Sequence, residues 1–190
     1  MKKNKISKNW INKQKRDIYV RKSKIEGFRS RAVYKLQDIN NKFKILKNGM
    51  TVIDLGAAPG SWTQLISKNF KNVKILSIDL KKIEKIENAF LIKGDFTEKE
   101  YQEKIKNFFG NKVDVIISDM AVDTTGNKNI DSIVTGDLCI EAIKFSKDFL
   151  KKDGKFVSKI FMGSNFNEIV SYSKKIFKEI HIFKPLSSRK

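Results

Sequence analysis

A glycine-rich turn and three aspartates are the residues whose types and spacing best suit ligand binding. The turn reads Gly-Ala-Ala-Pro-Gly over residues 56–60 and separates an apolar run from a stretch with helical spacing. Glycine at such a turn lets a ligand approach the backbone amides at the start of a helix. The turn lacks the G-x-G-x-x-G spacing that holds a pyrophosphate, so a nicotinamide-dependent enzyme is the weakest alternative. A cofactor without phosphates fits better.

The aspartates each follow an apolar run. Asp79 lies 19 residues beyond Gly60, where a carboxylate can accept hydrogen bonds from both hydroxyls of an adenosine ribose. Asp95 follows the next run and can accept from an adenine amino group, and Asp119 follows the one after that. One such aspartate is often only a turn or helix cap. Three in succession favour a nucleoside site.

Alternating strands and helices must position these residues. Short β-branched runs predict strands at 51–55, 73–78, 89–92, 113–118, 155–161 and 179–184. Helical spacing marks 61–69, 98–109, 130–151 and 165–177, whereas the connection at 81–88 is the least helical. This pattern predicts an α/β fold with an open, doubly wound, mainly parallel sheet, which binds ligands beyond the carboxyl ends of its strands.

An earlier amphipathic helix is predicted from Ser30, its N-cap, until Asn48-Gly49 breaks the pattern. It carries Lys35 among apolar neighbours. Lys159 interrupts the apolar strand predicted at 155–161, where burial normally excludes a lysine. Position therefore distinguishes these two lysines from ordinary surface charge.

The positive charge is concentrated near the start of the chain. The net charge is +19, and residues 1–35 hold 13 Lys or Arg against Asp17 and Glu26. A polyanionic partner is indicated, either nucleic acid or an acidic membrane surface, with compositional bias as the alternative. Basic residues interleaved with aromatic ones suit a segment that packs on the body while facing phosphates. A mitochondrial transit peptide would be richer in Arg and Ser.

Several classes of protein are disfavoured. No apolar run reaches the ~18–20 residues of a membrane span, and no secretory signal is recognisable, so we expect a soluble, cytoplasmic protein. The sequence has no Cys/His cluster with metal-ligand spacing, so no metal is expected. Cys139 is expected to be a small buried side chain, and His181 to be structural within the last strand.

The chain resembles the FtsJ/RrmJ-type (RlmE) 2′-O-ribose methyltransferases of ribosomal RNA. The similar stretches run in family order over nearly the whole chain: 30–36 (SRAVYKL), 54–62 (DLGAAPGSW), 93–96 (KGDF), 117–121 (ISDMA), 157–161 (VSKIF) and 184–189 (KPLSSR). The resemblance implies a single methyltransferase domain over 1–190, with a basic RNA-binding segment over 1–29. It also implies S-adenosylmethionine as cofactor and a uridine of large-subunit (23S) ribosomal RNA as substrate. We expect a monomer.

The resemblance also assigns site residues. It implies cofactor contacts at Gly60, Trp62, Asp79, Asp95 and Asp119, and a catalytic set of Lys35, Asp119 and Lys159. Lys159 would be the base, with its pKa lowered by burial or by positive charges nearby, because a ribose hydroxyl is a poor nucleophile until its proton is drawn away. Asp119 would orient this lysine, and Lys35 would hold the substrate ribose or its phosphate. Trp62 could equally be a core residue.

Two departures from the family pattern leave alternatives open. The stretch Asp119-Met120-Ala121-Val122-Asp123 lacks the proline that the family commonly has beside the aspartate. The family's fourth catalytic residue, a glutamate beyond the Lys-Pro-x-x-Ser-Arg stretch, has no counterpart, and we expect the C-terminal end to be incomplete. The alternatives are a transfer RNA 2′-O-ribose methyltransferase and a non-catalytic RNA-binding or ribosome-assembly factor on the same fold.

Overall fold

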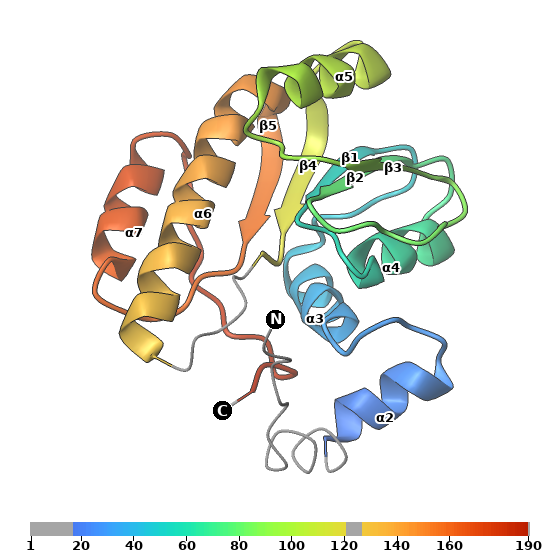
Figure 1. Ribbon diagram of the computed structural model, residues 1–190, viewed down its shortest axis with the longest axis horizontal. Helices are drawn as coiled ribbons and strands as arrows, with labels where there is room; N and C mark the ends of the chain where they lie inside the picture. The colour runs from blue at the N-terminus through green and yellow to red at the C-terminus, as the bar shows by residue number, and fades with distance from the viewer. Residues whose placement is uncertain (1–16, 121–126, 190) are drawn as a thin grey trace, which may run out of the picture.

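The fold is built around a five-stranded parallel sheet with the strand order β3-β2-β1-β4-β5 (Figure 1). The computed structural model describes residues 17–120 and 127–189. The strands are β1 (Thr51–Leu55), β2 (Lys74–Asp79), β3 (Ala89–Lys93), β4 (Val113–Ser118) and β5 (Leu150–Ser158). Every pair of neighbouring strands is parallel, which confirms the predicted open, doubly wound α/β fold.

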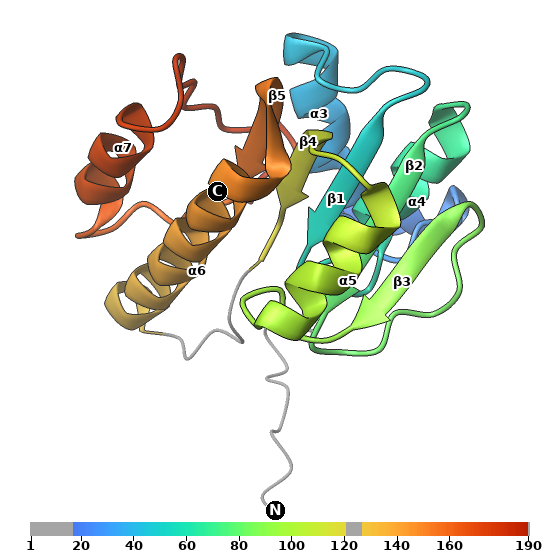
Figure 2. The ribbon, with the colours of Figure 1, turned by 90° about the horizontal axis from the view of Figure 1, so that it is seen from above.

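Six helices accompany the sheet in the described part of the chain. They are α2 (Ile18–Ile25), α3 (Val33–Phe43), α4 (Ser61–Asn69), α5 (Lys99–Phe109), α6 (Lys128–Phe149) and α7 (Phe166–Lys174). Figure 2 shows α5 and α6 in front of the sheet and α3 and α4 behind it. No helix among the described residues combines the length and apolar character that crossing a bilayer requires.

Strands with apolar side chains on both faces explain the two layers of helices. In β1, Val52 packs in the cluster that contains Leu36 of α3 and Leu65 of α4. The next residue, Ile53, points to the opposite face and packs with Phe145 of α6. This alternation follows from the two-residue period of a strand. Both faces of β1 are therefore buried, as the sequence pattern indicated.

The sixth predicted strand was wrong. Residues 179–184 are all described and form no strand. Their aromatic rings pack on α3, and the segment does not extend the sheet beside β5. The rings of His181 and Phe183 lie 5.2 and 5.5 Å from that of Phe43, measured between centroids. His181 is thus a packing residue, as predicted, but outside any strand.

Several element ends also differ from the prediction, and those of β5 and α3 bear on the site. Strand β5 begins at Leu150 and ends at Ser158, so Lys159 follows the strand instead of interrupting it. Its amide still donates to the Ser118 carbonyl, at 2.9 Å. Helix α3 begins at Val33, and Ser30 is not its N-cap. The Ser30 hydroxyl accepts from the amide of Ala32 in a turn that precedes the helix.

Candidate functional site

Three charged side chains meet beyond the carboxyl ends of β4 and β5. Lys35 comes from α3, Asp119 directly follows β4, and Lys159 directly follows β5. The Nζ of Lys35 donates to both carboxylate oxygens of Asp119 at 2.8 Å. The Nζ of Lys159 donates to the Asp119 carbonyl at 2.6 Å and lies 3.2 Å from Oδ1 of the same residue. The structure therefore brings together all three predicted catalytic residues.

The carboxylate of Asp119 contacts the ammonium groups of both Lys35 and Lys159. Burial lowers the pKa of Lys159, and the nearby positive charge of Lys35 lowers it further, although Asp119 acts in the opposite direction. All three side chains are mostly buried, with exposed fractions between 17% and 23%. Lys159 is therefore disposed to lose its proton, which gives the state that a general base needs.

The strand order places this cluster at the topological switch point of the sheet. Chain connections run outward in both directions from the neighbouring strands β1 and β4, so loops leave this point on opposite sides. The 56–60 turn follows β1, and Asp119 follows β4. Because β1 and β4 are parallel neighbours, the turn and the charged cluster lie at the same end of the sheet.

Glycine is required in the turn for steric reasons. Gly60 has φ of 103°, and a Cβ there would lie 2.6 Å from Cδ1 of Ile86 and 3.0 Å from a guanidinium nitrogen of Arg29. Gly56 has φ of 66°, and a Cβ there would lie 2.0 Å from Cγ of Met120. Both positions need the left-handed conformation as well as the space. Gly60 begins α4 and leaves the first amides of that helix for a ligand.

Asp79 is the last residue of β2, one residue beyond the predicted strand end, and Asp95 lies two residues beyond β3. Asp79 accepts from the amide of Ala58 at 2.9 Å and from that of Lys81 at 2.7 Å, one on each carboxylate oxygen. Asp95 uses Oδ1 to accept from the amide and hydroxyl of Thr97, and its Oδ2 has no hydrogen-bond partner among the described residues. These carboxylates retain acceptor capacity, so the residues present fit an adenosine.

Trp62 packs in the core, with an exposed fraction of 4%. Its indole Nε1 donates to the Ala32 carbonyl at 2.8 Å. This contact supports the start of α4 against the segment before α3. A direct contact between Trp62 and the cofactor stays a prediction.

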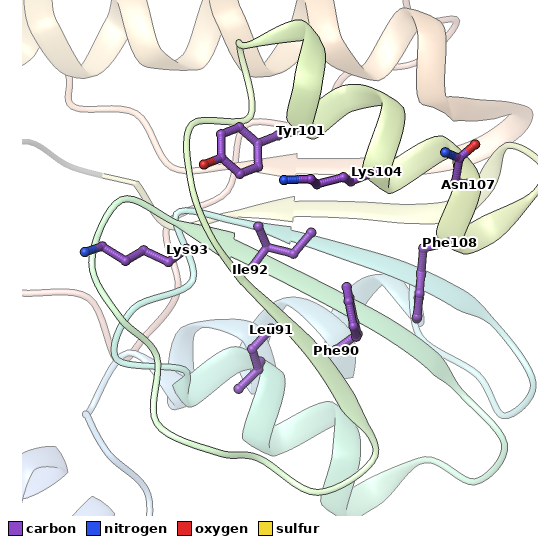
Figure 3. Close-up of a pocket in the computed structure, with 8 residues that line it drawn as sticks. All are labelled: Phe90, Leu91, Ile92, Lys93, Tyr101, Lys104, Asn107 and Phe108. Carbon is purple, nitrogen blue, oxygen red and sulfur yellow. The ribbon is translucent and has the colours of Figure 1, made fainter.

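A separate hollow of about 560 Å³ lies between β3 and α5 (Figure 3). Phe90, Tyr101, Phe108 and Lys93 line it, and none of the three charged residues of the site does. This hollow is therefore separate from the candidate site at the strand ends.

Comparisons with known proteins agree with this geometry. The sequence profile of FtsJ-like methyltransferases matches residues 28–190. The chain belongs to this family. A similar relative is the Ribosomal RNA large subunit methyltransferase E of Pelagibacter ubique, 65% identical over 190 residues that cover 100% of this chain and 94% of the relative. The protein of the same name from Rickettsia akari is 46% identical, over 96% of this chain and 83% of its own length.

Two solved structures share the fold of this chain. A Plasmodium falciparum protein described as a ribosomal RNA methyltransferase superimposes with a TM-score of 0.76 at 34% identity, covering 83% of this chain and 91% of that one. A TehB-like methyltransferase of Corynebacterium glutamicum, at 17% identity and a TM-score of 0.54, shares the fold alone. This chain is therefore a methyltransferase with a Rossmann-like sheet, and use of S-adenosylmethionine follows from its family.

Some of the predicted features lie outside the described residues. These are the first 16 residues of the basic segment and the Ala121-Val122-Asp123 part of the departure from the family pattern. Within the described ranges, no group of three or more His, Cys, Asp or Glu side chains is arranged to hold a metal ion. Cys139 is buried in the core, as predicted.

Sequence reasoning missed a buried polar cluster next to the glycine-rich turn at residues 56–60. Asp54 of β1 is 1% exposed and accepts from the Thr63 hydroxyl at 2.7 Å, which lies 2.7 Å from the Ser77 hydroxyl. Burial raises the pKa of Asp54 to about 7, against the hydrogen bond from Thr63. The signal in the sequence was a lone aspartate within the apolar run 52–55.

The raised pKa of Asp54 predicts an unusual dependence of stability on pH. The unfolded chain loses this proton near the ordinary aspartate pKa of 3.8, whereas the folded protein keeps it up to about pH 7. Between these values the folded state binds more protons, so the free energy of unfolding should fall as pH rises, by up to about 4 kcal/mol. Denaturant unfolding of the protein and of Asp54→Asn between pH 4.5 and 7.5 measures this, and the variant should lack the fall.

Asp114→Asn is a control, because Asp114 should affect the pH dependence of stability with the opposite sign. Partial burial favours the protonated form of Asp114, but its hydrogen bonds from Lys151 and Thr51 outweigh this and lower its pKa. Its contribution to stability is present above the unfolded pKa and is lost as pH falls, so this variant should lose stability mainly at neutral pH. An identical pH dependence in the protein and in Asp54→Asn would show that Asp54 is ionised in the fold.

Proposed function

We propose that this protein transfers the methyl group of S-adenosylmethionine to a ribose 2′-hydroxyl of large-subunit (23S) ribosomal RNA. The observation that carries the proposal is the Lys35–Asp119–Lys159 cluster beside the cofactor turn, in a chain whose relatives are named as ribosomal RNA large subunit methyltransferases. The cluster supplies a base and a cationic anchor, which are the two groups that a ribose hydroxyl needs.

The proposed cofactor site uses the residues at the strand ends. Asp79 accepts from the ribose hydroxyls of the cofactor, Asp95 from its adenine amino group through Oδ2, and the α4 amides after Gly60 bind its amino-acid end. Asp119 lies between this site and the two lysines. S-adenosylmethionine supplies a methyl group that is already activated on a positively charged sulfur.

The protein's remaining task is to align and deprotonate the hydroxyl. Lys159, as the neutral amine, accepts the 2′-hydroxyl proton while the oxygen forms its bond to the methyl carbon. Lys35 binds the ribose or an adjacent phosphate and holds the oxygen in line. Asp119 orients both amines. The proton leaves on Lys159; the bound cofactor would supply the methyl group, with the electron pair of the broken carbon–sulfur bond left on its sulfur.

The test is methylation of defined RNAs with labelled S-adenosylmethionine. Large ribosomal subunits, free 23S RNA and transfer RNA are compared, and the modified nucleotide is mapped by mass spectrometry. We expect a 2′-O-methyluridine in large-subunit RNA. Methylation of transfer RNA alone would favour the transfer RNA alternative. Binding of cofactor and RNA without transfer to any of the three would favour a non-catalytic assembly factor.

The exposed basic residues of α2 are proposed to contact RNA phosphates. Arg21 and Lys24 are exposed on this helix, within the predicted 1–29 segment. Replacing both with alanine should weaken RNA binding and reduce the slope of log affinity against log salt by about 0.7–0.9 for each phosphate that the protein no longer neutralises. Fluorescence anisotropy with labelled RNA over a range of KCl concentrations measures the slope.

The control removes two exposed lysines near the amino ends of the strands. Lys47 precedes β1 and Lys152 lies early in β5, at the sheet edge opposite the site. Lys47→Ala combined with Lys152→Ala changes the net charge equally but should leave the slope nearly unchanged. Equal slopes for the two double variants would indicate that the charge of α2 is only compositional bias.

A further inference from the structure

We propose that Arg29 is a positioning residue that holds the cofactor turn in its binding conformation and joins it to the RNA-binding segment. This inference rests on the proposed cofactor site. Arg29 lies in the connection between α2 and α3, far in sequence from both loops that it contacts.

The guanidinium of Arg29 bridges two loops through their backbone carbonyls. One nitrogen donates to the Pro59 carbonyl at 2.8 Å and to the Glu84 carbonyl at 2.9 Å. The other donates to the Lys85 carbonyl at 2.9 Å. Pro59 belongs to the cofactor turn, and the other two acceptors belong to the non-helical connection between β2 and β3. Asp79 lies directly before that connection, so Arg29 links the two loops that flank the proposed ribose site.

The Arg29 guanidinium packs closely against Gly60, the residue directly before α4. A Cβ on Gly60 would lie 3.0 Å from the Arg29 nitrogen that binds Pro59 and Glu84. The turn and the guanidinium therefore pack as one unit. A shift of either would alter the path of the backbone that presents the α4 amides to the cofactor.

The backbone around Arg29 is joined to α4 as well. The Arg29 amide donates to the Gln64 side chain at 3.0 Å, and the hydroxyls of Ser30 and Ser61 lie 2.7 Å apart. The Trp62 indole donates to the carbonyl of Ala32, directly before α3. Residues 29–32 are thus attached to the first turn of α4 before the chain enters the helix that carries Lys35.

The choice of arginine follows from the geometry of the acceptors. No carboxylate pairs with Arg29 among the described residues, and its guanidinium partners are three backbone carbonyls. A planar guanidinium presents several donors in a fixed fork, whereas a lysine offers one nitrogen at the end of a flexible chain. Arg29→Lys therefore keeps the positive charge and loses the set of hydrogen bonds to the three carbonyls. This separates a role in shaping the turn from a role in contacting RNA phosphates.

The experiment compares Arg29→Lys and Arg29→Ala with the unchanged protein. Titration calorimetry with S-adenosylmethionine, without RNA, gives the Kd for the cofactor, and steady-state assays give KM and kcat. Both variants should weaken cofactor binding about 10-fold, because the three hydrogen bonds that hold the turn are lost or weakened, with a matching rise in KM for the cofactor. At saturating cofactor, kcat should stay within about threefold, and Arg29→Lys should bind RNA normally.

Lys47→Ala is the control, since Lys47 is exposed and lies at the opposite end of the sheet, before β1. It should leave the Kd for the cofactor unchanged. Thermal unfolding establishes that each variant folds, and Arg29→Lys decides the question if Arg29→Ala does not fold. Cofactor binding by Arg29→Lys equal to that of the unchanged protein, or a loss confined to RNA affinity, would overturn the role of Arg29. Failure of the unchanged protein to bind S-adenosylmethionine would instead contradict the proposed function.

Discussion

Replacing Lys159 with alanine is expected to lower kcat by about 10²- to 10⁴-fold while S-adenosylmethionine still binds nearly as tightly. Burial is the main reason that the pKa of this amine is lowered, and the amine lies against Asp119 at the carboxyl ends of β4 and β5. Removing it leaves the ribose hydroxyl with no acceptor for its proton. Single-turnover transfer of a labelled methyl group, together with calorimetric binding of the cofactor, measures both effects.

Two further variants define the role of Lys159. Lys159→Arg keeps the positive charge but cannot act as a base at neutral pH, so it should be nearly as inactive as the alanine variant. Lys155→Ala, an exposed position earlier in β5, should retain full activity. For the unchanged protein, kcat should rise with pH as Lys159 loses its proton and then level off. Substantial turnover by Lys159→Arg would exclude Lys159 as the base.

The sequence predicted the parts of the fold that depend on local periodicity. Buried parallel strands have apolar residues on both faces, so β1 and β4 were found at their true bounds. The position of each aspartate after a strand then followed from topology, since parallel strands end at the same edge. The cluster of Lys35 with Asp119 came from a family resemblance, because 84 residues separate them and no local pattern connects them.

The errors arose where tertiary contacts override local preference. The β-branched and aromatic run 179–184 has strand character, but its rings find partners on Phe43 of α3. Arg29 gave no signal, because a residue that binds backbone carbonyls leaves no complementary side chain to recognise. The raised pKa of Asp54 depends on its burial where β1, β2 and α4 meet. Such properties become visible only when distant segments are placed together.

Asp119→Asn should impair the enzyme differently from Lys159→Ala, because Asp119 organises the cluster without accepting the proton. The carboxylate holds Lys35 by two contacts of 2.8 Å and lies 3.2 Å from Lys159. An amide leaves two mostly buried ammonium groups close together with no negative charge between them. We expect kcat to fall about 10²-fold through misplacement of both amines, and cofactor binding to weaken as well.

The pH dependence identifies this role. Asp119 raises the pKa of Lys159 against the effects of burial and of Lys35, so losing the carboxylate should lower that pKa further. The rising limb of log kcat against pH should move to lower pH in Asp119→Asn, although its plateau is reduced. Asp114→Asn, which removes the ion pair with Lys151 at the other end of β4, should leave kcat and its pH profile unchanged. If the plateau of log kcat fell but its rising limb stayed at the original pH, Asp119 would act on the cofactor alone. The charge that sets the protonation of Lys159 would then lie elsewhere.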